Sequence, residues 1–178
     1  MKGRACNLKY HNITHDDMLN GKGLRVVLWV SGCSHHCKNC HNPVTWNPDD
    51  GLEFDEAAKA ELFSYLKKDY IDGLTLSGGD PLYKGNVDTI SPLITEIREK
   101  FPDKTIWMYT GYTFEELFNK GNEKLLECVK KCDVLVDGKF VEELKNVHLP
   151  YRGSSNQRLI NIQQTLNRDH ITNESLKV

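Results

Sequence analysis

Three cysteines form the pattern of this chain that points most directly to chemistry. Cys33, Cys37 and Cys40 are spaced as C-x3-C-x2-C, and no fourth cysteine lies nearby in the sequence. Cysteine thiolates are the usual ligands of iron–sulfur clusters, and three of them would leave one iron of a cubane cluster without a protein ligand. An open coordination site on a metal is typical of catalysis, whereas a closed site is usually structural.

The same loop is also compatible with a zinc site, which His36 or His41 would complete as a Cys3His set. Such a chain would be a non-catalytic binding module. A second segment favours the cluster, because Gly78 and Gly79 stand directly before Asp80. Glycines let a ligand approach the backbone closely, and Asp80 or nearby amides could hold a charged amino acid head group. A zinc module has no need of such a segment.

Length, charge and hydropathy narrow the class of protein. The chain has 178 residues and a net charge of −2 without a long basic block, so nucleic-acid binding is not indicated. No run approaches the ~18 apolar residues of a membrane span, and the first ten residues lack the apolar stretch of a signal peptide. We therefore expect a cytoplasmic protein without a membrane partner, whose six cysteines stay reduced.

Apolar periodicity predicts an alternation of strands and helices. Strands are expected over residues 24–30, 73–77, 104–109, 134–136 and 158–162. Helices are expected over residues 55–68, 87–101 and 122–131, and from Thr113, which opens a capping-box pattern. This alternation indicates an α/β fold with a mostly parallel sheet, which right-handed crossovers would curl into a partial (β/α) barrel. We expect one domain over residues 1–162 and a polar C-terminal tail over residues 163–178.

Each of four glycine-bearing segments follows a predicted strand. Ligands of such α/β folds bind beyond the carboxyl ends of the strands. Because parallel strands end at the same edge, all four segments should lie together there. The segments are residues 31–43, 77–81, 110–112 and 137–139.

The cysteine spacing together with residues 77–81 resembles the radical S-adenosylmethionine superfamily. Within it, residues 106–112, 134–140 and 152–158 resemble the activating proteins of anaerobic (class III) ribonucleoside-triphosphate reductases. The cysteine triad is common to the superfamily. Two segments narrow the resemblance from the superfamily to these activating proteins: Asp-Gly-Lys-Phe (137–140) and Gly-Ser-Ser-Asn-Gln-Arg (153–158).

The resemblance implies a mechanism. Cys33, Cys37 and Cys40 would hold a [4Fe-4S] cluster whose open iron chelates the amino and carboxylate groups of S-adenosyl-L-methionine. One electron would cleave the sulfonium C–S bond, and the resulting 5′-deoxyadenosyl radical would take a hydrogen atom from a glycine of the reductase. The cofactors carry such chemistry, and the protein positions them and excludes water.

The resemblance also implies contacts and partners. Gly78 and Gly79 would lie along the methionine moiety, and Asn39 and His41, which flank Cys40, near the adenine. Many members have an aromatic residue where this chain has Asn39, so we expect a backbone contact there. The implied partners are the reductase as protein substrate, a flavodoxin-type electron donor and a second copy in a homodimer. No large substrate-capping domain is evident, so the active edge should be open to a protein loop.

Two other functions keep the same chemistry: activation of a different glycyl-radical enzyme, and a radical reaction on a small molecule. Outside the motifs, Cys128 and Cys132 are expected to be small packing residues. Arg152 and Arg158 are candidates for contact with a partner or a carboxylate, with solvated surface positions as the alternative.

Overall fold

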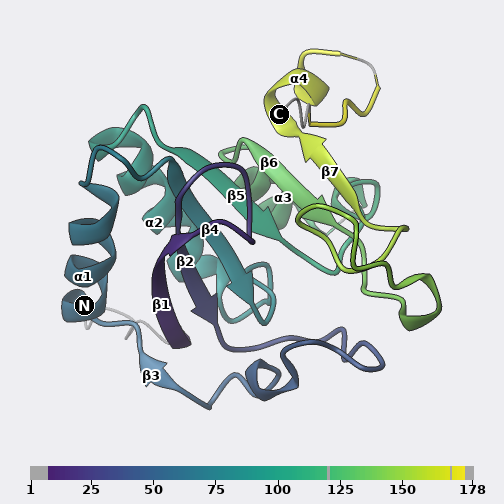
Figure 1. Ribbon diagram of the computed structural model, residues 1–178, viewed down its shortest axis with the longest axis horizontal. Coiled ribbons are helices and arrows are strands. Elements are labelled where there is room, and N and C mark those ends of the chain that lie inside the picture. The colour runs from purple at the N-terminus through teal and green to yellow at the C-terminus, as the bar shows by residue number, and fades with distance from the viewer. Residues whose placement is uncertain (1–7, 120, 169, 175–178) are drawn as a thin grey trace.

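The computed structural model describes residues 8–119, 121–168 and 170–174 as a mixed α/β fold around one open sheet (Figure 1). Residues 1–7, which hold Cys6 and most of the segment searched for a signal peptide, and residues 175–178 of the predicted tail lie outside this description. The described strands follow the order β3-β1-β2-β4-β5-β6-β7 across the sheet. They are β1 (Lys9–Asp17), β2 (Arg25–Val30), β3 (Leu52–Glu53), β4 (Gly73–Gly78), β5 (Thr105–Tyr109), β6 (Val134–Asp137) and β7 (Arg158–Asn161). The helices are α1 (Glu56–Leu66), α2 (Val87–Lys100), α3 (Glu123–Val129) and α4 (Ile162–Leu166), with 3-10 turns η1 (Pro43–Thr45), η2 (Glu116–Phe118) and η3 (Glu142–Leu144).

The sheet is partly parallel, which corrects the prediction of a mostly parallel one. Strands β2, β4, β5 and β6 run parallel, whereas β1, β3 and β7 pair antiparallel with their neighbours. Strand β1 was not predicted, because only Tyr10 and Ile13 of that strand are buried and it contains no apolar run. Strand β3 was not predicted, because two exposed residues carry no periodic signal.

The remaining predicted elements are confirmed to within a few residues, with one exception. The segment that begins at Thr113 forms only the 3-10 turn η2 instead of a helix. Its capping box is present, since Thr113 N donates to Glu116 Oε2 at 2.7 Å and Glu116 N donates to Thr113 Oγ1 at 3.3 Å. The turn ends at Asn119, which is extended, and Gly121 and Asn122 that follow have low helix propensity.

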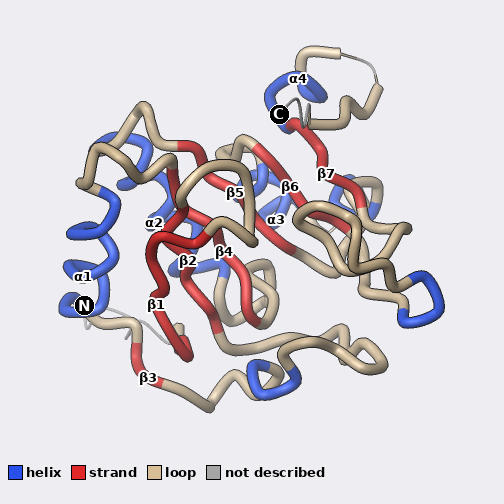
Figure 2. The backbone as a smooth tube through the Cα atoms, viewed as in Figure 1, coloured by secondary structure: helices blue, strands red, loops and turns tan. Residues whose placement is uncertain are grey.

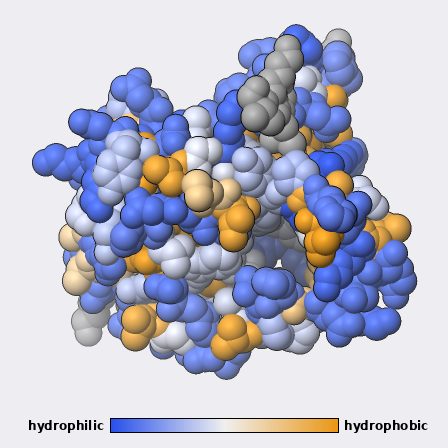
Figure 3. Space-filling view, viewed as in Figure 1, coloured by the Kyte–Doolittle hydropathy of each residue, from blue (hydrophilic) through white to orange (hydrophobic). Residues whose placement is uncertain are grey.

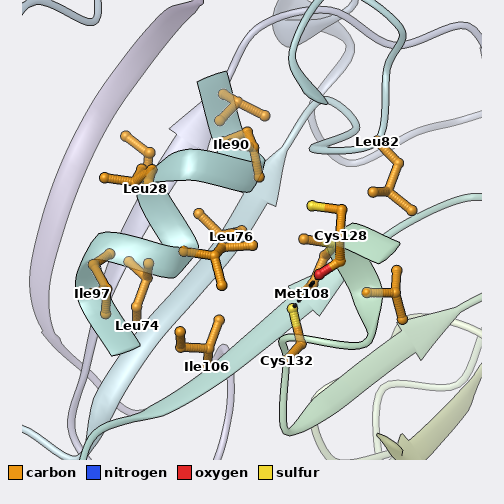
Figure 4. Packing of buried hydrophobic residues seen from close by; sticks show 14 of the residues in the cluster. Leu28, Leu74, Leu76, Leu82, Ile90, Ile97, Ile106, Met108, Cys128 and Cys132 are labelled. Carbon is orange, nitrogen blue, oxygen red and sulfur yellow. Dashed lines mark hydrogen bonds between the residues drawn. The ribbon is translucent and has the colours of Figure 1, made fainter. Parts of the chain in front are cut away.

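One face of the sheet is covered by α1, α2 and α3, which bury the larger hydrophobic cluster (Figures 1 and 2). Alternate strand residues such as Leu28, Leu76 and Met108 belong to this cluster (Figure 4). Cys128 and Cys132 lie among them with no exposed surface, as predicted for packing residues. Full burial of a Leu or Ile side chain stabilises a fold by about 1.5–3 kcal/mol, so this layer holds the parallel strands in place.

On the opposite face of the sheet, the buried Arg25 side chain links the first residues of the parallel strands β2, β4 and β5 through hydrogen bonds. The Arg25 guanidinium donates to Thr75 Oγ1 at 2.6 Å, to Leu74 O at 2.6 Å and to Thr105 Oγ1 at 3.0 Å. It also lies 5.3 Å from the centroid of the Trp107 ring. Burial lowers the pKa of Arg25 to about 10. The hydrogen bonds to these oxygen atoms offset the cost of burying the Arg25 charge. Arg25 is the first residue of β2, so it lies at the end of the strand away from the cysteine loop.

The described part of the C-terminal segment folds back onto the sheet edge. Asn161 N donates to Thr172 O at 2.9 Å, and Glu174 N donates to Leu159 O at 2.7 Å. The boundary at residue 162 between a domain and a tail stays a prediction. Over the described residues, every helix is too short or too polar to cross a membrane.

Candidate cofactor site

The four predicted segments do meet at one edge of the sheet. Val30 of β2 pairs in parallel register with Gly78 of β4, so the cysteine loop and the glycine segment begin at the same level. Gly79 N donates to Val30 O at 2.7 Å, and Thr110 N donates to Val136 O at 3.0 Å. The carboxyl ends of all four parallel strands therefore carry the residues that the sequence singled out.

The cysteine loop, residues 31–47, is closed at its base by two backbone hydrogen bonds. Gly32 N donates to Thr45 O at 2.8 Å, and Cys33 N donates to Trp46 O at 3.1 Å. Between these points His36 and Asn39 have positive φ angles of 46° and 54°, a backbone region that non-glycine residues adopt rarely. Between Cys37 and Cys40 the chain makes one tight turn, which a hydrogen bond from Cys40 N to Cys37 O closes at 3.1 Å.

The chemistry of the three thiols fits a cluster. Cys33, Cys37 and Cys40 are each half-buried. Burial raises the pKa of the Cys33 thiol, and hydrogen bonds from the backbone of His35 and His36 oppose that rise. Asn42 N approaches Cys40 Sγ at 3.4 Å as a donor. Hydrogen bonds to cluster sulfurs are one of the means by which proteins set the reduction potential.

The candidate ligands on this loop are three thiols. In the part of the chain that the structure describes, no three His, Cys, Asp or Glu side chains gather closely enough to hold one metal ion. The thiolates of a cubane bind different irons, so they stand further apart than the ligands of one ion. Thiolates are the usual ligands of iron–sulfur clusters, so the three thiols of this loop would hold one.

The glycine segment packs directly on the base of the cysteine loop. A Cβ on Gly79 would lie 2.5 Å from Gly32 O and 2.9 Å from Thr45 O, and Asp80 N donates to Gly32 O at 2.8 Å. Gly78 has a φ of 101°, and a Cβ there would lie 2.7 Å from Val30 O. Glycine is therefore required at both positions by the close approach of two backbones.

Asp80 is the centre of a hydrogen-bond network that spans three of the four segments. Its side chain is only 2% exposed. Asp80 Oδ2 lies 2.6 Å from His35 Nε2 and accepts from Thr110 Oγ1 at 2.9 Å and from Gly111 N at 3.1 Å. Asp80 Oδ1 accepts from Leu82 N at 2.8 Å. This carboxylate therefore fixes the cysteine loop, the glycine segment and the loop after β5 relative to one another.

His35 is a site residue that was not predicted from the sequence, whereas Thr110 lies in the predicted segment 110–112 without a role having been assigned to it. The His35 ring also packs edge-on against Tyr112, with centroids 4.8 Å apart. The available signal was its position between Cys33 and Cys37, which it shares with His36; only His36 and His41 were considered as possible zinc ligands. Those two side chains and Asn39 are exposed, so they remain accessible to a ligand.

A cavity of about 850 Å³ adjoins the other side of this loop base without including any predicted site residue. It lies between the first turns of α1 and α2 and is lined by acidic side chains such as Asp49 and Glu56. Asn86, which lines it, donates to Ser31 O at 2.8 Å and to Asp80 O at 3.0 Å. Through Asn86, the wall of this cavity thus holds the base of the cysteine loop and the glycine segment in place.

The last two sequence motifs contact each other across the end of β6. Asp137 is buried and accepts hydrogen bonds from Arg158 and, at 2.8 Å, from Phe114 N. Arg158 also donates to both carboxylate oxygens of Glu115, at 2.8 and 2.7 Å. The prediction that Arg158 meets a carboxylate is confirmed, and both carboxylates belong to this chain. Hydrogen bonds from Arg158 lower the pKa of Glu115 to about 2.

Comparison with known proteins agrees with this geometry. Residues 19–160 match the family model described as a 4Fe-4S single cluster domain. The chain is 47% identical over 152 residues to the anaerobic ribonucleoside-triphosphate reductase-activating protein of Enterobacteria phage T4, which covers 85% of this chain and 93% of the relative. It is 43% identical over 143 residues to the protein of that name from Haemophilus influenzae (79% of this chain, 90% of the relative). The Escherichia coli K12 protein of that name is 43% identical over 152 residues (84% and 96%).

The match to the family model covers the cysteine loop, the glycine segment and the paired motifs around β6 and β7 in one continuous stretch. The chain therefore belongs to the family of anaerobic ribonucleoside-triphosphate reductase-activating proteins.

Proposed function

We propose that this chain activates an anaerobic ribonucleoside-triphosphate reductase by generating a glycyl radical on it, with a [4Fe-4S] cluster and S-adenosylmethionine as cofactors. The observation that carries the proposal is the junction of two segments at one strand edge. Asp80 N donates to Gly32 O, and the Asp80 carboxylate contacts His35, so the glycine segment is joined to a loop with three available thiols. The shared name of the relatives supports the reductase as the protein substrate.

Each residue at the site has a proposed role. Cys33, Cys37 and Cys40 hold the cluster through their thiolates. Asn39 and His41 are exposed beside Cys40 and contact the adenine, the former through its backbone. When bound, the cluster and S-adenosylmethionine supply the electron and the 5′-deoxyadenosyl radical for the reaction.

The glycine segment orients the cofactor in this proposal. Gly78 and Gly79 lie along its methionine moiety and bring backbone amides close to it. The Asp80 side chain has four hydrogen-bonding partners within the protein, so its contribution to cofactor binding is to hold the cysteine loop and the glycine segment together. The buried network around it excludes water from one side of the site.

Further features follow the family resemblance and are part of the proposal. The electron donor is a flavodoxin-type protein, the active form is a homodimer or a complex with the reductase, and the protein works in the cytoplasm. Residues 1–162 form a single radical S-adenosylmethionine domain, followed by a C-terminal tail. The parallel strands β2, β4, β5 and β6 form the wall of a partial (β/α) barrel.

The test is reconstitution without oxygen. We expect a brown protein that, once reduced with dithionite, converts S-adenosylmethionine to methionine and 5′-deoxyadenosine. Added reductase should then give a glycyl radical signal in electron paramagnetic resonance. A colourless protein with stoichiometric zinc would overturn the proposal. Cleavage without a reductase radical would favour another glycyl-radical enzyme or a small molecule as the target.

A further inference from the structure

A loop between β6 and β7 lies beside the cysteine loop and has no part in the cofactor site described above. Residues 139–155, the 139–155 loop from here on, include η3 and occupy the green segment at the lower right of Figure 1. Glu143 Oε1 of this loop accepts a hydrogen bond from Lys38 Nζ at 3.3 Å. Because Lys38 stands between Cys37 and Cys40, the two loops are neighbours at the same edge.

The 139–155 loop is held in one shape by the motifs at its ends. Gln157 Nε2 donates to Gly138 O at 3.0 Å, and Gln157 Oε1 accepts from Gly153 N at 3.0 Å. Asn156 Nδ2 donates to Lys139 O at 2.8 Å. Side-chain amides thus join the two strands at the base of the loop, which reduces its freedom before any partner binds.

A strained residue anchors the far part of the same loop. Tyr151 has a positive φ of 58°, which is uncommon for a bulky residue. Tyr109 Oη donates to Tyr151 O at 2.7 Å, and the Tyr151 ring packs edge-on against Trp107 at 5.4 Å. Strain of this kind persists only where surrounding contacts determine the conformation, and it is common in binding segments.

The surface of the 139–155 loop has two features of an uncovered interface. Leu144 is 43% exposed and Val147 is 81% exposed, and Figure 3 shows apolar areas among hydrophilic side chains at the right of this view. The basic residues Lys139, Lys145 and Arg152 outnumber the acidic Glu142 and Glu143.

We propose that the 139–155 loop is the docking surface for the reductase segment that receives the radical. This inference rests on the proposed function and names where the protein substrate binds. Hydrogen-atom transfer requires contact between the reacting atoms, so the substrate must dock at the edge that holds the cofactor. An electron donor has no such constraint. The bound segment is apolar where it covers Leu144 and Val147, and it carries carboxylates for the surplus positive charge.

The test uses the full chain, reconstituted with its cluster, and the double variant Leu144→Asp/Val147→Asp. Dithionite is the reductant, so no protein donor takes part. We expect cleavage of S-adenosylmethionine without the reductase to stay at the wild-type rate. The initial rate of glycyl radical formation on the reductase should fall by about tenfold or more, since apolar anchors of an interface dominate its affinity. Binding to immobilised reductase should weaken by a similar factor.

The matched control is Met18→Asp/Leu19→Asp. These residues are 68% and 80% exposed. They lie just before β2, whereas the cysteine loop follows the other end of that strand. The control should keep both rates and the affinity for the reductase. The variant Val147→Leu, which preserves apolar surface, should also form the radical normally. Circular dichroism and iron content check that all variants are folded and loaded.

The outcomes separate the proposals. Normal radical formation and binding by the double variant would overturn the docking surface, and so would a parallel loss of S-adenosylmethionine cleavage. A defect seen only with a flavodoxin-type donor would assign the loop to that donor, and an altered sedimentation coefficient of the isolated variant would assign it to a second copy. Failure of the wild type to cleave S-adenosylmethionine would sink the proposed function instead. Binding to immobilised reductase would still decide the docking surface.

Discussion

The chain contains two groups of cysteines in contrasting surroundings. Cys33, Cys37 and Cys40 are half-buried on a loop after β2, whereas Cys128 and Cys132 have no exposed surface in the core under the sheet. Burial raises the pKa of Cys128 to about 12 and that of Cys132 well above its ordinary value. A thiol binds metal as the thiolate, so burial disfavours metal ligation by Cys128 and Cys132.

The difference teaches that sequence spacing alone does not identify a ligand. Cys128 and Cys132 stand four apart, at the end of a helix, and Cys132 Sγ approaches Cys128 O at 3.8 Å. Cys33 and Cys37 have the same separation in a loop. What distinguishes the two pairs is the surrounding protein. Cys128 and Cys132 pack among hydrophobic side chains, whereas the half-buried Cys33 accepts hydrogen bonds from backbone amides.

The largest difference is expected between two variants that each remove one cysteine, one from each group. Cys37→Ala should lose most of its iron and its brown colour, because a cluster with two remaining ligands is not held firmly. Cys128→Ala should keep the cluster and lose about 1 kcal/mol of stability, since one buried group of methylene size is removed. Iron analysis, visible absorption and urea unfolding measure both. Retention of a full cluster in Cys37→Ala would contradict the assignment.

Replacing Gly79 tests the support beneath the first group. In Gly79→Val, a Cβ would meet Gly32 O and Thr45 O, which are backbone atoms that cannot rotate away. Displacement of the cysteine loop should lower the rate of S-adenosylmethionine cleavage by about a hundredfold, the scale expected for an ångström of misplacement. The control Gly85→Ala meets only the Tyr83 side chain, at 3.1 Å. Equal rates in the two variants would show that the contact has no importance.

Alkylation should separate the two groups in the cluster-free protein. At pH 8, iodoacetamide should modify the half-buried Cys33, Cys37 and Cys40 in the folded protein, and the reaction of Cys33 should speed up on unfolding because burial raises its pKa. Cys128 and Cys132 should react only after unfolding in urea. Peptide mass spectrometry measures each site. Rapid labelling of Cys128 in the folded protein would contradict its place in the core.

The smallest effect is a pH dependence of stability from the buried group. The pKa of Cys128 rises from an ordinary value of 9.0 to about 12 in the folded protein. Its favourable contribution is therefore complete below about pH 9 and is lost as the pH rises toward 12, by at most about 1.4 kcal/mol per pH unit. Urea unfolding between pH 8 and pH 10.5 should show a shallower decline for Cys128→Ala than for the wild type. An identical decline of stability with pH in the two proteins would contradict the raised pKa of Cys128.

Much of the site was determined by the sequence itself. The spacing of Cys33, Cys37 and Cys40 predicts a ligand set within one loop, and apolar runs identify the four strands that become the parallel centre of the sheet. Both signals are local, because ligand spacing and burial period are properties of neighbouring residues. Since parallel strands end at one edge, the meeting of the glycine-bearing segments follows from those local signals.

Only the tertiary structure decided how that edge is held together. His35 and Asp80 are 45 residues apart in the chain, and their contact depends on β2 and β4 being neighbours in register. The antiparallel edge strands and the amide contacts that shape the 139–155 loop likewise depend on pairing between distant segments. Polar side chains at such positions carry no periodic signal, because their partners are fixed by the order of strands and not by the adjacent sequence.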